Sequence, residues 1–253
     1  MSWRVVAAAA AGTAHAVSCR PCEDRCRARV QSTVDGVPVL SIFVADGAGS
    51  AAFGAQGAGL AVAAPAALLA RRIREPGFLP SAPLAVEMLR RIRAYIDAAA
   101  RSRGRLPRHF ACTFVGVVST PGATLVMQIG DGGVVLDTGA GLELPIAPMC
   151  GEYANTTHFV TDADAIERLQ TRIYAGPAAR VAAFSDGLQR LALDLAGGTP
   201  HRPLFDRLFG VIAAAGAAQA PGLHPALLRL LTSDGVNART DDDKTLALAV
   251  RMQ

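Results

Sequence analysis

The stretch HFACTFVGVVSTPGATLVMQIGDGGVVLD, residues 109–137, contains three short apolar runs, at 109–118, 124–129 and 134–137. Thr-Pro-Gly and Asp-Gly-Gly separate these runs, and such residues form tight turns between antiparallel strands. We therefore predict a β-meander in the middle of the chain. A meander at this place argues against a regular β-α-β alternation with a parallel sheet.

On the N-terminal side, the apolar patterns predict strands and a pair of helices. The alanine-rich start of the chain and the segment 37–45 (VPVLSIFVA) are typical of strands. Residues 52–74 and 83–103 repeat apolar residues at helical spacing, with Pro and Gly between them. The apolar stretch 57–70 is shorter than the roughly 20 residues that span a bilayer, so we expect no membrane segment.

On the C-terminal side, short strands alternate with helical patterns without forming β-α-β units. We expect strands at 158–161, 180–184 and 245–252, and helices at 188–195, 203–215 and 224–232. The whole order predicts an α+β sandwich. No linker interrupts it, so we expect one domain over residues 1–253.

The composition excludes disordered and fibrous proteins, because 51% of the 253 residues are hydrophobic. Five cysteines, an odd number in a chain too large to need disulfides, favour the reducing cytoplasm. The net charge of +4 comes mostly from arginines in the two long predicted helices. These form either a solvated face or a surface for an acidic or phosphorylated protein. With 5% aromatic residues and no binding motif, we expect no nucleic-acid partner.

Acidic residues recur where predicted strands end or begin. They are Glu23-Asp24, Asp46-Gly47, Asp131-Gly132, Asp186-Gly187 and the run Asp241-Asp242-Asp243. A single Asp-Gly pair indicates only a turn. Several carboxylates converging from different strand ends would repel one another unless a cation neutralised them. Because all the ligands would be oxygens, the pattern favours Mg²⁺ or Mn²⁺ over zinc.

Six segments occur in the order found in the metal-dependent protein serine/threonine phosphatases of type 2C, and the sequence resembles the compact bacterial branch of that family. They are GTAHAVSCRPCEDR (12–25), VADGAGS (44–50), ACTFVGVV (111–118), QIGDGG (128–133), FSDGL (184–188) and DDKTLALAV (242–250). The resemblance implies a central antiparallel β-sandwich flanked by helix pairs, in four layers. It also implies direct hydrolysis of phosphoserine and phosphothreonine in proteins, without a phosphoenzyme, opposing a kinase.

The resemblance implies a site for two Mg²⁺ or Mn²⁺ ions, with Asp46, Asp186 and Asp242 as the catalytic acids. Asp46 resembles the acid that bridges the two ions, and Gly47 the residue whose carbonyl binds the second. Asp186 and Asp242 look like the remaining ligands of the first ion. Two such ions would activate a water that attacks phosphorus in line.

Other positions imply the outer part of this site. Asp24, with Glu23 beside it, matches the pair that holds water molecules of the second ion. Asp131 resembles an acid that forms a third, weaker metal site together with Asp186. A further family acid of that third site is replaced here by Arg190.

The substrate side departs from the family. Many members carry a phosphate-binding Arg where this chain has Cys19, and Arg20 comes one residue later. If this segment were a strand, that shift would turn the side chain to the opposite face. His15 is a second candidate for the phosphate, although a lone His near a strand is more often structural. A His that some members have after the Asp-Gly is Ala48 here.

Three questions stay open at the level of sequence. The departures allow an alternative function, a regulatory module that binds phosphoproteins with little turnover. Cys19, Cys22 and Cys26 have a spacing within reach of a metal site but no evident fourth ligand, so we interpret them as structural thiols or a redox-sensitive pair. Residues 141–157 fall where the family has a variable flap, and we expect substrate choice there and in the basic helices.

Overall fold

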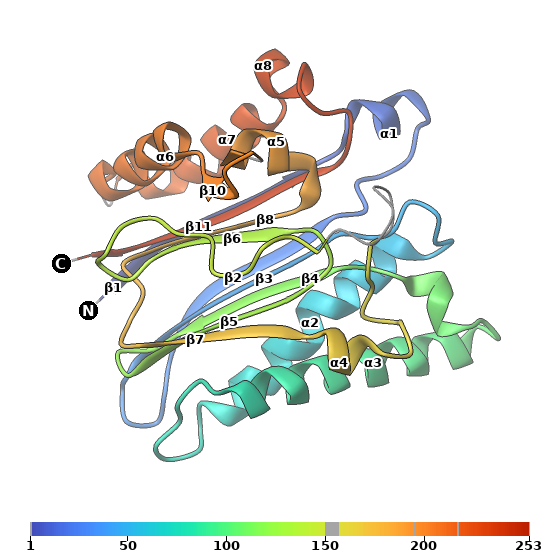
Figure 1. Ribbon diagram of the computed structural model, residues 1–253, viewed down its shortest axis with the longest axis horizontal. Helices are drawn as coiled ribbons and strands as arrows, with labels where there is room; N and C mark the ends of the chain where they lie inside the picture. Colours follow the sequence, from blue (N-terminus) through green and yellow to red (C-terminus); the bar gives the residue numbers. More distant parts are fainter. Residues whose placement is uncertain (1, 150–156, 195, 217, 253) are drawn as a thin grey trace.

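Two antiparallel sheets form the centre of the protein in a computed structural model that describes residues 2–149, 157–194, 196–216 and 218–252 (Figure 1). The five-stranded sheet has the order β2 (Arg25–Ser32), β3 (Pro38–Ala45), β4 (Phe114–Ser119), β5 (Ala123–Ile129), β7 (Gln170–Ala175). The four-stranded sheet has the order β1 (Ser2–Ala10), β11 (Lys244–Met252), β8 (Arg180–Phe184), β6 (Gly133–Asp137). A small hairpin pairs β9 (Leu193–Asp194) with β10 (Thr199–Pro200).

Helices cover the outer face of each sheet (Figure 1). α2 (Gly54–Arg72) and α3 (Ala82–Ser102) lie on the five-stranded sheet, and α6 (Arg202–Ala214) and α7 (Ala220–Leu231) lie on the four-stranded sheet. The short helices are α1 (Thr13–Val17), η1 (Pro107–Phe110), α4 (Ala165–Arg168), η2 (Asp186–Leu188), α5 (Gln189–Ala192) and α8 (Asp234–Asn237). None of the helices in the described ranges combines the length and the apolar character needed to cross a bilayer.

The buried side chains fall into three clusters that match the three interfaces between four layers. One joins α2 and α3 to the five-stranded sheet, one joins α6 and α7 to the four-stranded sheet, and the third lies between the sheets. β3 contributes to two of them, because Phe43 faces the helices while Leu40 and Ile42 face the other sheet. The predicted α+β sandwich with flanking helix pairs is confirmed.

The predicted meander is wrong in its third strand. β4 and β5 form the expected hairpin, with Val117 opposite Val126. β6 instead leaves this sheet and pairs with β8 in the four-stranded sheet. The turn after β5 contains Gly130 with a φ of +97°, a conformation that favours glycine and redirects the chain between the sheets. Turn residues therefore indicate where each strand ends, but they do not show whether the next strand in the sequence pairs with it.

Other predicted elements also differ from the structure. Residues 107–110 form η1, so the predicted strand at 109–118 begins only at Phe114. Residues 158–161 form no strand, and Val160 instead makes one backbone hydrogen bond to Cys112 and is fully buried. The segment predicted as a helix at 188–195 divides among η2, α5 and β9, with residue 195 outside the described ranges. The edge strands β2 and β7 were missed because exposed polar residues interrupt their apolar pattern.

Candidate active site

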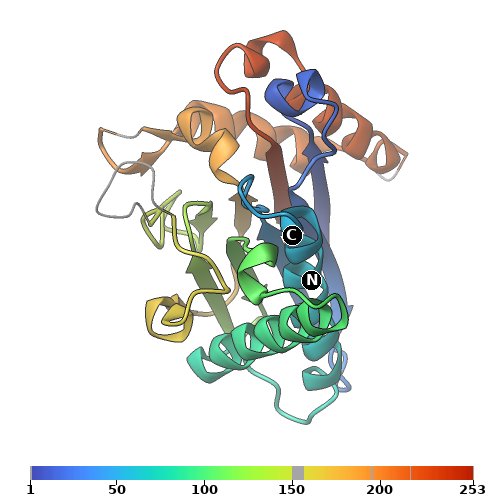
Figure 2. The same ribbon diagram turned by 90° about the vertical axis from the view of Figure 1, so that its right-hand side faces the viewer.

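The acidic residues predicted from strand ends lie at one end of the sandwich, which faces the viewer in Figure 2. Asp24 precedes β2, Asp46 follows β3, Asp186 follows β8, and Asp242 precedes β11. Because β2 pairs antiparallel with β3, and β8 with β11, the end of one strand lies beside the start of its partner. Asp131 lies in the turn between β5 and β6. Antiparallel pairing within each sheet, together with the packing of the two sheets, therefore gathers residues from five distant segments.

Two glycines allow the loops at this end to approach closely. A Cβ atom on Gly187 would lie 2.0 Å from the carbonyl oxygen of Asp243, and one on Gly12 would lie 2.2 Å from that of Asp241. Neither distance is compatible with a side chain. These glycines thus hold the loop after β8 and the start of α1 against the acidic run before β11.

A pocket of about 390 Å³ opens between these loops. Its lining includes His15, Asp46, Asp131, Asp186, Asp242 and Asp243. Gly47 also lines it, and its backbone bridges to Cys112 beside the pocket. Asp24 is only 1% exposed, and it accepts a hydrogen bond from Ser185 Oγ at 2.6 Å. The structure therefore brings Asp46, Asp131, Asp186 and Asp242 together around one cavity, whereas Asp24 is buried and does not line it.

Burial makes three of these carboxylates costly to ionise. It raises the pKa of Asp24 to about 7, although hydrogen bonds, the one from Ser185 first, oppose this. Burial, and next the charges of Asp24 and Asp186, raise the pKa of Asp46 well above its usual range. Burial also raises the pKa of Asp186 to about 6. Each carboxylate removed from water beside another favours a bound proton or a bound cation.

Two buried oxygen atoms of these three carboxylates have no hydrogen-bond donor among the described residues. Asp24 Oδ1 and Asp186 Oδ1 are buried and have no hydrogen-bond donor in the structure. The carboxyl of Asp46 interacts with those of both residues, so the three carboxyl groups are direct neighbours. Such unpaired anionic oxygens fit divalent metal ions, which prefer carboxylate ligands.

No group of three or more His, Cys, Asp or Glu side chains within the described ranges could hold an ion by itself. An ion here would thus need backbone carbonyls or water in addition to carboxylates. Mg²⁺ is usually bound in this way, through one or two carboxylates and several waters.

Asp131 and Asp242 lie on the more open side of the pocket. Burial raises the pKa of Asp131, and a hydrogen bond from Thr157 Oγ1 opposes this. Gln189 Nε2 donates to the backbone carbonyl of Asp131 and fixes the turn. Asp242 is exposed and accepts a hydrogen bond from the backbone N–H of Asp243 at 2.8 Å.

Asp243 is a site residue to which the sequence analysis assigned no role. It is 3% exposed, and Oδ1 accepts hydrogen bonds from the backbone of Gly12 at 2.7 Å and from His15 Nδ1 at 2.9 Å. Oδ2 accepts from the backbone N–H of Glu23 at 2.5 Å. In the sequence this residue is one of three consecutive Asp, and only the fold distinguishes the buried one from its exposed neighbours.

Comparisons with known proteins show the family of this chain. The family model described as protein phosphatase 2C matches residues 11–227. The serine/threonine-protein phosphatase 3 of Escherichia coli (strain K12) is 48% identical over 250 residues, which cover 99% of this chain and 99% of that protein. The chain belongs to the protein phosphatase 2C family. The resemblance stated from the six segments is thereby confirmed.

Solved structures share the fold of this protein phosphatase 2C member. A serine/threonine phosphatase of Mycobacterium tuberculosis, PstP/Ppp, has a TM-score of 0.66 at 16% identity, with 100% of both chains covered. The catalytic domain of PstP in complex with two manganese ions has a TM-score of 0.65 at 16% identity, with 99% of both chains covered. Serine/threonine phosphatase Stp1 of Staphylococcus aureus has a TM-score of 0.61 at 13% identity, covering 100% of this chain and 96% of that chain.

The arginine beside the site of this protein phosphatase 2C member is already engaged. Arg20 donates from Nη2 to Glu23 Oε1 at 2.7 Å and to the carbonyl oxygen of Gly49 at 3.3 Å. Residues 18–24 form a turn and irregular backbone, so the argument from the two faces of a strand does not apply to them. Cys19 has a φ of 53° and is exposed. Arg20 therefore bridges two loops at the pocket instead of simply replacing the family arginine one position earlier.

Cys22 and Cys26 of the cysteine cluster are protonated, unreactive thiols at neutral pH. Burial raises the pKa of Cys22 to about 12 and that of Cys26 to about 11, with the charge of Asp24 adding to both. Thiols with raised pKa values are poor nucleophiles and poor metal ligands at neutral pH. Of the flap segment 141–157, residues 150–156 lie outside the described ranges, so the predicted role of that segment stays a prediction.

Proposed function

We propose that the protein hydrolyses phosphoserine and phosphothreonine in proteins, with Mg²⁺ or Mn²⁺ as the cofactor. The observation that carries this is the group formed by Asp24, Asp46 and Asp186, in which Asp24 Oδ1 and Asp186 Oδ1 are buried without a donor in the described part of the chain. The 48% identity to a serine/threonine-protein phosphatase supports the reaction class. The manganese ions in the structure of PstP, which shares the fold, support the choice of metal.

The residues fit two ions. Asp46 would bridge them, because its carboxyl interacts with both Asp24 and Asp186. Asp186 and Asp242 would be the remaining protein ligands of the first ion, and the Gly47 carbonyl would bind the second ion. When bound, the ions lower the pKa of a water that attacks phosphorus, and they offset charge on the phosphoryl oxygens.

The outer residues of the site support these ligands. Asp24, held by Ser185, would orient water on the second ion, and Asp131 would serve a third, weaker ion. Glu23 has one oxygen bound to Arg20, while its Oε2 is buried without a donor. The bond to Glu23 would hold the guanidinium of Arg20 at the rim where a phosphoprotein enters.

We also propose the context in which this reaction takes place. The substrate would be a phosphorylated protein, and the reaction would oppose a serine/threonine kinase. Residues 1–253 would act as one catalytic domain, since β1 and β11 pair along their length and join the two ends of the chain. The four described cysteines are free thiols, which supports a cytoplasmic location.

The first test measures phosphate release from a phosphothreonine peptide with Mn²⁺, with Mg²⁺ and with EDTA. We expect metal-dependent release that is absent in EDTA and in the Asp186→Asn variant. Asp194→Asn serves as a matched control, because this exposed carboxylate lies in β9 outside the pocket lining. If the protein binds metal by calorimetry but releases no phosphate, the enzyme assignment fails and the phosphoprotein-binding module replaces it.

A further inference from the structure

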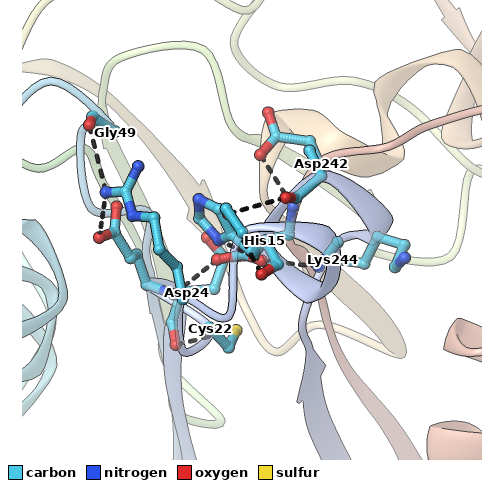
Figure 3. Close-up of polar contacts among 12 residues, drawn as sticks. His15, Cys22, Asp24, Gly49, Asp242 and Lys244 are labelled. Carbon is cyan, nitrogen blue, oxygen red and sulfur yellow. Dashed lines mark hydrogen bonds and ion pairs between the residues drawn. The ribbon is translucent and has the colours of Figure 1, made fainter.

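His15 is held in the pocket by its own hydrogen bond to Asp243 and by that of the neighbouring backbone to Asp241. α1, which carries it, starts directly after Gly12, and Ala14 donates its backbone N–H to the carbonyl of Asp241 at 3.0 Å. The His15 side chain is 15% exposed and lines the pocket together with Asp46 and other acids. Figure 3 shows His15 in the same group of polar contacts as Asp24 and Asp242. Its position is therefore part of the site and not of the outer surface.

The partner of His15 determines which ring nitrogen is available. Nδ1 lies 2.9 Å from Asp243 Oδ1, and Asp243 itself is buried and held by the backbone N–H groups of Gly12 and Glu23. An ionised carboxylate only accepts hydrogen bonds, so Nδ1 carries a hydrogen and donates it. Among the described residues no hydrogen bond is found for Nε2. When the ring is an imidazolium, Nε2 carries a proton as well.

The reaction needs such a proton. Hydrolysis of a phosphoserine or phosphothreonine expels an alkoxide, which is a poor leaving group unless it is protonated. The His that some family members have after the Asp-Gly is Ala48 here. Among the described residues that line the pocket, His15 is the side chain of the type most often used as a general acid. The other ionisable side chains of that lining are carboxylates.

We propose that His15 is the general acid of this phosphatase and that Asp243 is its positioning residue, which rests on the function proposed above. As the oxygen of the attacking water bonds to phosphorus, that water releases a proton to solvent. The bond between phosphorus and the serine or threonine Oγ breaks, and its electron pair goes to Oγ. Nε2 of His15 gives its proton to Oγ, and the imidazole regains one from solvent.

A change of leaving group isolates this step. We would compare His15→Asn with the wild type on a phosphothreonine peptide and on p-nitrophenyl phosphate, both with Mn²⁺. Asn places its amide nitrogen near the position of Nδ1, so it can still donate to Asp243 but offers no acidic proton to the substrate. Because p-nitrophenolate is a stable leaving group, we expect little change in kcat on that substrate. On the peptide, we expect kcat to fall by about 100-fold or more, with KM nearly unchanged.

The matched control is His224→Asn. His224 is an exposed histidine whose Nδ1 also makes a hydrogen bond, here to the carbonyl of Ala7 at 2.9 Å, and it lies in α7 outside the pocket lining. We expect neither substrate to be affected.

Equal losses of His15→Asn activity on both substrates would overturn the proposal, because they indicate a role in binding or stability. No loss on either substrate would also overturn it. If the wild type hydrolyses neither substrate, it is the proposed function that fails. Activity of the variant on p-nitrophenyl phosphate also shows that it is folded.

Discussion

Two aspartates at strand ends show opposite solutions to burying a carboxylate. Asp137, at the end of β6, accepts hydrogen bonds from the backbone of Gly139 at 2.7 Å and Gly141 at 3.1 Å, and from Arg180 Nη2 at 2.7 Å. Burial alone would raise its pKa, but these partners together lower it. Asp46, at the end of β3, has two carboxylates as neighbours instead, and its pKa rises.

The difference teaches how to separate a structural acid from a functional one. Both residues precede or lie near a glycine in the sequence, so the turn signal is similar. The chain supplies donors to Asp137, and that carboxylate stabilises the fold. It supplies no such donors to the free oxygens around Asp46, which are left for a ligand. Unpaired buried acids of this kind cluster at functional sites.

The largest effect that this comparison predicts is on turnover. Asp46→Asn should lower phosphate release by more than about 100-fold, because even outer partners of metal ligands contribute roughly 10–100-fold. Its fold should persist, since removing one charge reduces repulsion among the buried acids. Initial rates with Mn²⁺ and circular dichroism would test this. Near-normal turnover of the folded variant would contradict the bridging role of Asp46.

A second effect concerns stability without metal. The pKa of Asp24 is raised from 3.8 to about 7 and that of Asp186 from 3.8 to about 6. Between about pH 4 and 7 the folded protein therefore binds more protons than the unfolded chain, and the free energy of unfolding falls as the pH rises. The Tm of the metal-free protein should be higher at pH 5 than at pH 8, and Mn²⁺ should raise it most at pH 8.

Thermal unfolding of Asp186→Asn provides the control for this second effect. Because the variant lacks one carboxyl group with a raised pKa, its Tm should fall less between pH 5 and 8 than that of the wild type. An equal or larger loss in the variant would mean that other groups cause the dependence.

The sequence predicted much of the fold because apolar periodicity reports burial. α2 and α3 lie within two residues of their predicted limits, and β8 occupies the predicted 180–184. It could not predict that β6 joins the other sheet, because the turn after Ile129 has the same composition whether it closes a hairpin or crosses between layers. β7 escaped because an edge strand with exposed side chains has no apolar alternation to detect.

The acids of the site could be predicted for a different reason. Asp46 and Asp186 follow strands, and strand ends are recognisable, but β3 and β8 belong to different sheets, so only the packing of the two sheets brings these acids together. The hydrogen bond between His15 and Asp243 joins residues 228 positions apart, and no local pattern encodes it. The coupling of Arg20 to Glu23 likewise depends on the irregular segment after α1.

The smallest effect is expected for Asp137, the buried carboxylate that has hydrogen-bond donors. Asp137→Asn keeps the shape of the side chain but weakens its bonds to Arg180, so the free energy of unfolding should fall by about 1–3 kcal/mol. Because Asp137 is outside the pocket lining, kcat per folded molecule should not change. Urea unfolding and initial rates on the same preparation would measure both quantities. A fall in kcat comparable to that of Asp46→Asn would mean that the presence of hydrogen-bond donors does not separate structural from functional aspartates in this protein.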